Sequence, residues 1–247
     1  MWDDVKALNA AAATLATLVA LAFIAGAVAW AVRQPLFAFR DIVVTDPLAR
    51  ADPAYVESVL REDLRGTFFT LDLDTARAAL HEVPWVKHVA LRRQWPSRLE
   101  VSIEEYAPLA RWNDAALVDV DGNVFDADYN GELPQFDGPE GRAPELAARY
   151  RRFRDVLAPL GLTLTALRMT PRGSWSLTTA DARGALAIEL GRSDPDERLA
   201  RLASNWSHTV GALMRAGTVV DYVDMRYRTG FAARVPGFQE KPQKKAA

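Results

Sequence analysis

An uninterrupted apolar segment near the N-terminus constrains this chain more than any other feature of its sequence. Residues 10–32 form 23 consecutive positions without a charged side chain, nearly all of them apolar, and Lys6 and Arg33 bracket them. An α-helix rises 1.5 Å per residue, so about 20 apolar residues match the roughly 30 Å hydrocarbon core of a bilayer. The sequence therefore predicts a transmembrane helix at 10–32, with a short tail at 1–9.

A cleaved secretory signal is the alternative for this segment, because Ala27 and Ala29 form an A-x-A-like pattern. The length of the segment favours an uncleaved anchor, since the apolar region of a signal peptide typically spans about 7 to 15 residues behind a positively charged end. Here Asp3 and Asp4 outnumber Lys6. We therefore expect the helix to be retained as a membrane anchor.

Neither charge nor cysteine content decides on which side of the membrane the folded region lies. Lys6 and the N-terminal amine precede the apolar segment, and Arg33 and Arg40 follow it, so the positive-inside rule leaves both orientations open. The chain has no cysteine, which excludes disulfides, thiolate metal sites and cysteine nucleophiles. Its net charge of −2 gives no general attraction to nucleic acid.

The region after the anchor divides into two folded units, and the first is expected at 35–108. Asp52 and Pro53 supply a cap and a first helical residue, and the following apolar residues recur at helical spacing as far as Gly66. Alternating residues then indicate two strands joined by a turn at 95–97. The expected order is a strand at 39–45, a helix from Pro53, a helix at 74–81, and strands at 85–93 and 98–106.

The second unit is expected at 109–236, as a mixed α/β domain built on an antiparallel sheet. Asp194, Pro195 and Glu197 resemble a capping box at the start of its second helix. Residues 237–247 lack apolar periodicity and are predicted to form a disordered tail. The expected elements are strands at 109–112, 117–120, 124–125, 163–170, 175–179, 185–190 and 219–227 and helices at 145–157 and 194–216.

The sequence offers little that resembles a catalytic or metal site. No two of His81, His88 and His208 are separated by three or four residues, and no nucleophile elbow, P-loop or dinucleotide-binding glycine pattern is present. Glu104 and Glu105 point to opposite faces of the same predicted strand, which favours structural roles over shared acid–base work. We therefore predict no catalytic residue and no cofactor.

One acidic stretch imitates a calcium loop. Residues 126–131 match the first six positions of an EF-hand loop. The twelfth position, where such a loop needs a bidentate glutamate, holds Asp137, and Pro134 occupies the ninth. The stretch is therefore interpreted as a solvated turn without metal.

Several segments together carry a family resemblance. In their order and spacing they closely resemble the bacterial cell-division family FtsQ/DivIB over nearly the whole chain. The segments are Val83–Pro96, Leu99–Val101, Glu105–Asn113, Asp121–Phe125, Thr170–Trp175, Leu190–Arg192 and Tyr222–Gly230. The resemblance implies an α+β fold: a cytoplasmic tail, one inner-membrane helix, a periplasmic POTRA domain and a C-terminal β domain. The β-α-α-β-β order expected for the first unit is the order of a POTRA domain.

The resemblance also implies a function. Members of this family are not enzymes. They are essential scaffolds at the division septum that bind FtsB and FtsL in the periplasm and connect early division proteins to septal peptidoglycan synthesis by FtsW and FtsI. The predicted location is therefore the inner membrane, with the N-terminus in the cytoplasm and both folded units in the periplasm.

Sheet physics and the resemblance together single out candidate partner-binding residues in the second unit. An unpaired edge strand offers backbone groups that a partner strand can extend, and the strand at 219–227 is the candidate edge. The resemblance places FtsB contacts on Arg226, Tyr227, Thr229 and Gly230. For Tyr227 a buried tyrosine at the end of the strand is the alternative.

Two further groups of contacts follow from the resemblance alone. Related sequences often carry two basic residues before Ser-Trp, but this chain has Arg172-Gly173, so only Arg172 can serve that role. In the POTRA domain, contacts with division proteins such as FtsK are expected around the second strand, at Lys87, His88 and Arg92. The polar side of a half-buried strand is an equally simple account of these three residues.

Two other functions remain as alternatives at this stage. The first is a membrane-anchored periplasmic hydrolase whose carboxylates are scattered in sequence. The second is a POTRA-containing outer-membrane assembly factor, which would also need a barrel of many alternating strands.

Overall fold

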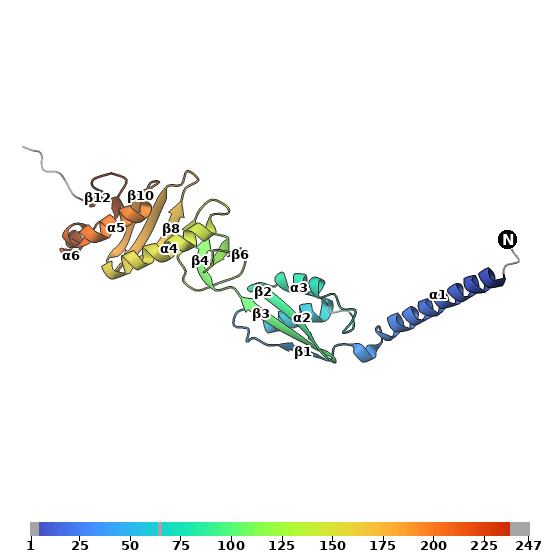
Figure 1. The fold of residues 1–247 in the computed structure, drawn as a ribbon. Coiled ribbons are helices and arrows are strands. Elements are labelled where there is room, and N and C mark those ends of the chain that lie inside the picture. Colours follow the sequence, from blue (N-terminus) through green and yellow to red (C-terminus); the bar gives the residue numbers. More distant parts are fainter. Residues whose placement is uncertain (1–4, 64–65, 238–247) are drawn as a thin grey trace, which may run out of the picture. The chain divides into compact units, whose positions relative to one another are not determined.

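The computed structural model describes residues 5–63 and 66–237 of the chain (Figure 1). Residues 1–4 of the predicted tail and all but Gly237 of the predicted disordered tail lie outside these ranges. The chain separates into two compact units, Met1–Tyr106 and Ala107–Ala247.

Helix α1 (Val5–Ala31) contains the predicted membrane-spanning segment. Its residues Leu8–Ala31 are long and apolar enough to cross a bilayer, and none of the most apolar part of this stretch is buried by other described residues. The hydroxyls of Thr14 and Thr17 donate to carbonyls one turn earlier, at 2.8 Å each. These polar groups are therefore satisfied inside the helix, as a lipid environment requires.

The rest of the first unit is a three-stranded sheet with two helices on one face. Strand β1 (Asp41–Val44) pairs in parallel with β3 (Arg98–Glu105), which pairs antiparallel with β2 (Val86–Gln94). Along β3, Leu99, Val101 and Ile103 are buried, whereas the alternate positions are mostly exposed. Helices α2 (Pro53–Asp63) and α3 (Leu73–His81) therefore cover the apolar face, and the predicted element order is confirmed (Figure 1). A short 3₁₀ turn, η1 (Pro35–Phe37), precedes β1.

Side-chain carboxylates fix the loops of this unit. Asp52 accepts from the backbone N–H of Ala54 at 2.9 Å, and Asp72 caps α3 by accepting from Asp74 and Thr75. Glu105, at the end of β3, accepts hydrogen bonds from three consecutive N–H groups of residues 49–51, the shortest at 2.8 Å. Burial alone would raise the pKa of Glu105, but these backbone hydrogen bonds lower it below its usual value.

The second unit is a nine-stranded mixed sheet in the order β12-β11-β10-β9-β8-β7-β4-β5-β6. Most neighbours are antiparallel, while β10–β11, β4–β7 and β7–β8 are parallel. The strands are β4 (Pro108–Trp112), β5 (Ala116–Asp119), β6 (Val124–Phe125), β7 (Gln135–Asp137), β8 (Thr163–Met169), β9 (Trp175–Asp181), β10 (Gly184–Gly191), β11 (Tyr222–Asp224) and β12 (Ala232–Arg234).

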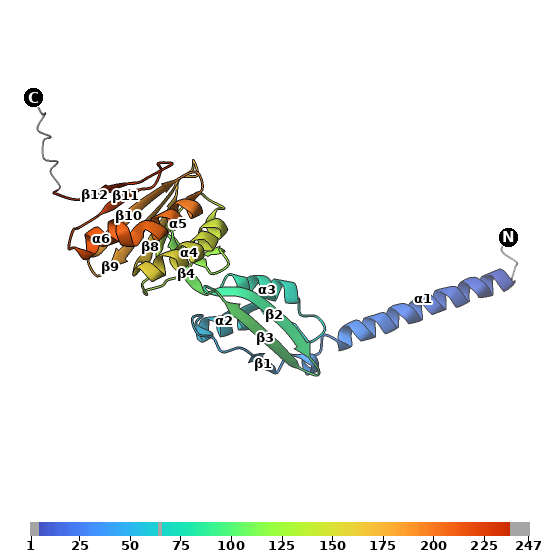
Figure 2. The ribbon, with the colours of Figure 1, turned by 60° about the vertical axis from the view of Figure 1, so that its left-hand side comes forward.

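Three helices, α4 (Ala143–Leu157), α5 (Pro195–Asn205) and α6 (Val210–Arg215), lie on one face of this sheet (Figure 2). Short 3₁₀ turns, η2 (Ala158–Leu160) and η3 (Trp206–His208), follow α4 and α5. The rings of Phe153 and Trp175 meet edge to face with centroids 6.4 Å apart. On Trp175 the guanidinium of Arg149 lies 4.7 Å from the ring centroid. Aromatic pairs of this kind add about 0.5–1.5 kcal/mol beyond the area they bury.

The continuous helix predicted at 194–216 is wrong, because η3 and Thr209 separate α5 from α6. The buried Trp206 packs against Gly211 so closely that a Cβ at Gly211 would lie 2.5 Å from Nε1 of its indole ring. The predicted capping box is wrong as well. Asp194 adopts a left-handed backbone conformation with φ +49° and makes no side-chain cap, whereas a capping residue normally has an extended backbone.

The strand predicted at 219–227 is shorter than expected and is not an edge. Only residues 222–224 form β11, which lies between β10 and the further strand β12. Sequence reasoning missed β12, because three residues rich in alanine carry almost no strand signal. The edge of the sheet on this side is therefore β12.

Candidate functional site

Candidate residues far apart in sequence meet at one end of the second sheet. Trp175, which begins β9, pairs with Gly191 at the end of β10 and with Met169 at the end of β8. Strand β11 runs parallel to β10 and ends at the same side. The turn that carries Arg172 and the segment after β11 that carries Arg226 therefore lie at the same end of the sheet.

Arg226 is held by a buried carboxylate on β11. Its Nη2 and Nε donate to the two oxygens of Asp224 at 2.7 and 2.9 Å. The Asp224 side chain is 8% exposed and that of Arg226 is 58% exposed. The hydrogen bonds from Arg226 lower the pKa of Asp224, and those to Asp224 raise the pKa of Arg226. The pair therefore stays charged and presents one side of a guanidinium to solvent.

A second carboxylate lies beside this pair. Glu189 of β10 is the cross-strand neighbour of Asp224 and accepts from the hydroxyl of Ser174 at 3.5 Å. Burial raises the pKa of Glu189, and the negative charge of Asp224 adds to the shift while Arg226 opposes it. Two carboxylates, Asp224 and Glu189, therefore lie beside Arg226 at this end of the sheet.

The segment 227–230 places an aromatic ring on the surface. Tyr227 is 55% exposed, so the alternative of a buried tyrosine is wrong. Thr229 is exposed, and Gly230 is partly exposed. Arg201 of α5 donates to the backbone carbonyls of Tyr227 and Arg228 at 3.1 and 2.9 Å. The backbone of the segment is therefore fixed while the Tyr227 ring lies in solvent.

The edge strand β12 follows directly after this segment. It pairs with β11, and its three residues are all exposed. Arg234 anchors it, because the Arg234 guanidinium donates to both oxygens of Asp221 at 2.8 and 2.9 Å. Within residues 66–237, the outer side of β12 is an open sheet edge next to an exposed tyrosine.

The candidates of the first unit do not share one environment. His88 and Arg92 are exposed on the face of the sheet that the helices leave uncovered. Lys87 is different: a bulge at 86–88 breaks the alternation, its side chain is only 14% exposed, and its Nζ lies 3.7 Å from Glu104. Lys87 therefore does not share the exposed surface of His88 and Arg92.

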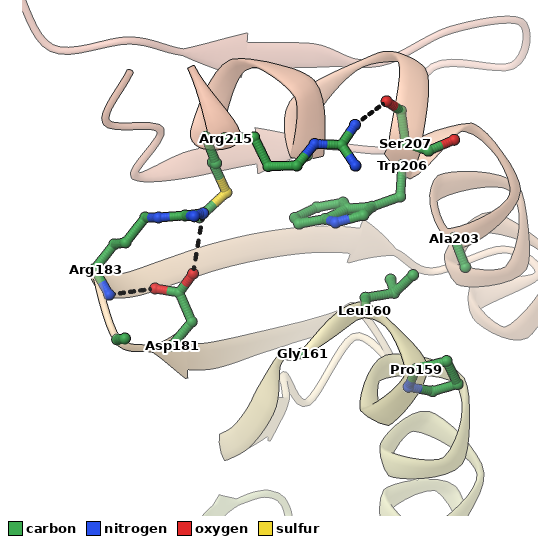
Figure 3. Close-up of a pocket in the computed structure, with 12 residues that line it drawn as sticks. Pro159, Leu160, Gly161, Asp181, Arg183, Ala203, Trp206, Ser207 and Arg215 are labelled. Atoms are coloured by element: carbon green, nitrogen blue, oxygen red, sulfur yellow. Dashed lines mark hydrogen bonds and ion pairs between the residues drawn. The ribbon is translucent and has the colours of Figure 1, made fainter. Parts of the chain in front are cut away.

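A hollow of about 510 Å³ lies between η2, the β9–β10 turn and α6 (Figure 3). The groups that line it bond to one another. The backbone N–H of Arg183 donates to Asp181 at 2.7 Å, and Arg215 donates to the carbonyl of Ser207 at 2.6 Å. No histidine lines it. Its polar groups therefore stabilise the turns around it, and they do not form a nucleophile–base arrangement.

The acidic stretch 126–131 follows β6 without a helix on either side. Within the described ranges, no three histidine or carboxylate side chains converge where they could hold a metal ion.

Sequence reasoning missed Asp224 and Arg201 as parts of the site. Asp224 had a detectable signal, because residues two apart in a strand share a face and Asp-x-Arg can pair. Arg201 had none, since its contact joins a helix to a segment 26 residues further on.

The fold and its parts match known families. Residues 37–106 match the POTRA domain, FtsQ-type, and residues 110–226 match the model for cell division protein FtsQ/DivIB, C-terminal. With the N-terminal apolar helix, these matches define the class of single-pass membrane proteins with a POTRA domain.

Curated relatives agree over nearly the full length. The chain is 39% identical to cell division protein FtsQ of Burkholderia pseudomallei (strain K96243), over 97% of this chain and 96% of that protein. It is 33% identical to cell division protein FtsQ of Nitrosospira multiformis, over 95% and 99% of the two chains. The Escherichia coli (strain K12) protein of the same name is 36% identical, over 71% and 64%. The chain belongs to the FtsQ/DivIB family of cell division proteins.

The family match also marks a boundary within the site. Arg172 and Arg226 lie inside residues 110–226, whereas Tyr227, Thr229, Gly230 and β12 follow them. The open edge therefore lies just beyond the matched segment.

Proposed function

We propose that this protein is an essential scaffold of the divisome in the bacterial inner membrane. Its N-terminus lies in the cytoplasm, and both folded units lie in the periplasm at the division septum. The second unit binds FtsB and FtsL, and the protein thereby connects early division proteins to septal peptidoglycan synthesis by FtsW and FtsI. It has no catalytic activity of its own.

The observation that carries this proposal is the open edge of β12 beside the exposed Tyr227. A partner segment that pairs with β12 gains backbone hydrogen bonds along the edge, and alternate side chains of that segment supply specificity. A tyrosine next to the edge offers a large contact area at low entropic cost. Because Arg201 already fixes the backbone of Tyr227, little order has to be gained on binding.

Arg226 adds a charge partner to this edge. Its Nε and Nη2 are committed to Asp224, but a guanidinium carries five N–H donors in a planar fork. A partner carboxylate therefore meets a guanidinium that is already oriented. In the second unit, Arg172 lies at the same end of the sheet and offers a second guanidinium to the partner.

For the POTRA domain we propose a separate contact surface for division proteins such as FtsK, formed by His88 and Arg92 on the uncovered face of the sheet. Lys87 borders this surface. Its side chain is mostly buried and pairs with Glu104.

The test is the affinity of the full-length protein, in detergent, for the periplasmic part of FtsB. Tyr227→Ala should weaken binding about 30-fold, which corresponds to about 2 kcal/mol for an aromatic anchor. Tyr55→Ala is the matched control, because Tyr55 is 48% exposed on α2 and lies outside the proposed surface. Equal affinity of the two variants would contradict the residue assignment. Normal septation in cells depleted of the protein would contradict the function.

A further inference from the structure

Three segments of the first unit meet next to the C-terminal end of α1. The N–H of Arg40 donates to the carbonyl of Ser97 at 2.9 Å, which joins the residues before β1 to the β2–β3 turn. The N–H of Phe68 donates to the carbonyl of Phe37 at 2.7 Å. The hydroxyl of Thr67 donates to the carbonyl of Val32 at 2.6 Å, one residue after α1 ends. The α2–α3 loop and the β2–β3 turn therefore both lie close to the chain as it leaves α1.

Each of the three segments exposes a large apolar side chain. Leu36 is 69% exposed, Phe69 is 51% exposed and Trp95 is 77% exposed. We call these three residues the juxtamembrane rim. Phe69 is supported from behind, because its ring centroid lies 5.3 Å from those of Phe37 and Phe68. Large apolar side chains that are exposed close together mark a surface for a partner or a membrane.

The chain length limits how far the juxtamembrane rim can lie from a bilayer. Leu36 is five residues after Ala31, the last residue of α1. Five residues reach at most about 18 Å when fully extended. The interfacial layer adds only about 5–8 Å on each side of the hydrocarbon core, so this reach allows Leu36 to lie within the layer. Tryptophan and other aromatic residues are enriched there.

Basic residues accompany the juxtamembrane rim. Arg33 and Arg40 are exposed, and neither guanidinium forms an ion pair with residues 5–63 or 66–237. Asp41 follows Arg40 directly, but its carboxylate pairs with Arg98, at 4.0 Å, and not with Arg40. Guanidinium groups that lie this close to the end of α1 and form no ion pair suit the phosphate groups of phospholipids.

We propose that the juxtamembrane rim binds the phospholipid surface of the bilayer that α1 spans, with Leu36, Phe69 and Trp95 in the interfacial layer and Arg33 and Arg40 at the phosphate groups. The first unit is then held against the membrane by a second attachment in addition to α1. This inference rests on α1 being a membrane anchor, and it does not depend on which division proteins bind the second unit.

The absence of cysteine makes a direct test possible, since one introduced cysteine gives one labelling site. Full-length protein carrying Gln94→Cys, next to Trp95, is labelled with a nitroxide and reconstituted into vesicles of phosphatidylethanolamine and phosphatidylglycerol. Ala49→Cys is the control, because Ala49 is exposed and its N–H bonds to Glu105 at the opposite end of β3. The readout is the collision rate of each label with oxygen and with a water-soluble nickel chelate.

We expect the ratio of the oxygen collision rate to the nickel-chelate collision rate to be several-fold higher for the label at residue 94 than for the label at residue 49. The combined variant Leu36→Ser, Phe69→Ser and Trp95→Ser should return the label at residue 94 to water-like behaviour, with an unchanged circular dichroism spectrum. Water-like behaviour at residue 94 in the otherwise unchanged protein would overturn the proposal, whether or not the triple variant folds. Dipolar broadening between labels at residue 94 would assign the surface to a second copy and would also overturn it.

Discussion

Asp224 and Arg226 form a two-point ion pair in which the carboxylate is buried and the guanidinium is on the surface. Their spacing of two residues places both side chains on one side of the chain as it leaves β11. The direction of Arg226 is therefore set by the protein itself and does not depend on a bound partner.

Replacing the buried carboxylate should cost stability. Asp224→Asn keeps the shape of the side chain but removes the charge that pairs with Arg226, and we expect a loss of about 1–3 kcal/mol in the free energy of unfolding. Asp221→Asn is the matched control, since Asp221 and Arg234 are 35% and 65% exposed and solvent screens such a surface pair, so we expect a smaller loss. Chemical denaturation of both variants at neutral pH measures the difference. A larger loss for Asp221→Asn would be inconsistent with this account.

The adjacent carboxylates at the end of β3 should differ in the same way. Glu105→Gln removes a charged acceptor shared by three N–H groups and should destabilise the first unit by about 1–3 kcal/mol. Glu104→Gln should cost less, because the Glu104 carboxylate is 59% exposed and its ion pair with Lys87 is long, at 3.7 Å.

The effect of Glu105 should also depend on pH. Because hydrogen bonds lower its pKa in the folded state, Glu105 contributes stability above its unfolded pKa of 4.5, and this contribution is lost as the pH falls through the folded pKa. The gap between wild type and Glu105→Gln should therefore be largest near neutrality and close in acid. Thermal unfolding across this range measures it, and a gap that widened in acid would refute the assignment.

Two glycines with the same backbone conformation should respond differently to a side chain. Gly122 and Gly217 have φ values of +89° and +85°. A Cβ at Gly122 would lie 2.8 Å from the backbone nitrogen of Pro144, whereas at Gly217 nothing lies within 4 Å. We expect Gly217→Ala to cost about 1–2 kcal/mol through the left-handed conformation alone, and Gly122→Ala to cost about 1–3 kcal/mol more. Equal midpoints in urea would show that the contact with Pro144 relaxes freely.

The sequence was most informative where one physical signal dominated. The apolar segment predicts α1 because its length and its lack of charge fit the hydrocarbon core of a bilayer. Alternation along β3 predicts its buried residues correctly. Prediction failed where a distant contact decided the local structure. The packing of Trp206 on Gly211 interrupts a helix that its periodicity favours, and β12 exists because β11 offers it a partner.

The candidate site shows the same division. The exposure of Tyr227 depends on where the chain turns after β11, and Arg201, far away in sequence, fixes that turn. A bulge in β2, which alternation cannot predict, moves Lys87 out of the exposed group. Local patterns therefore located the segments that matter, while long-range contacts set which of their side chains reach the surface.

The parallel pairing of β1 with β3 has a mechanical consequence. The chain enters the three-stranded sheet at the start of β1, beside Arg98, and leaves it after Glu105, at the opposite end of the adjacent strand. A pulling force between these two points therefore acts along both strands in opposite directions. All the hydrogen bonds between the two strands then resist in shear at once, whereas in a hairpin pulled from its open end they would break one by one. A protein fixed in a membrane at one end and loaded at the other carries tension through this geometry without unzipping.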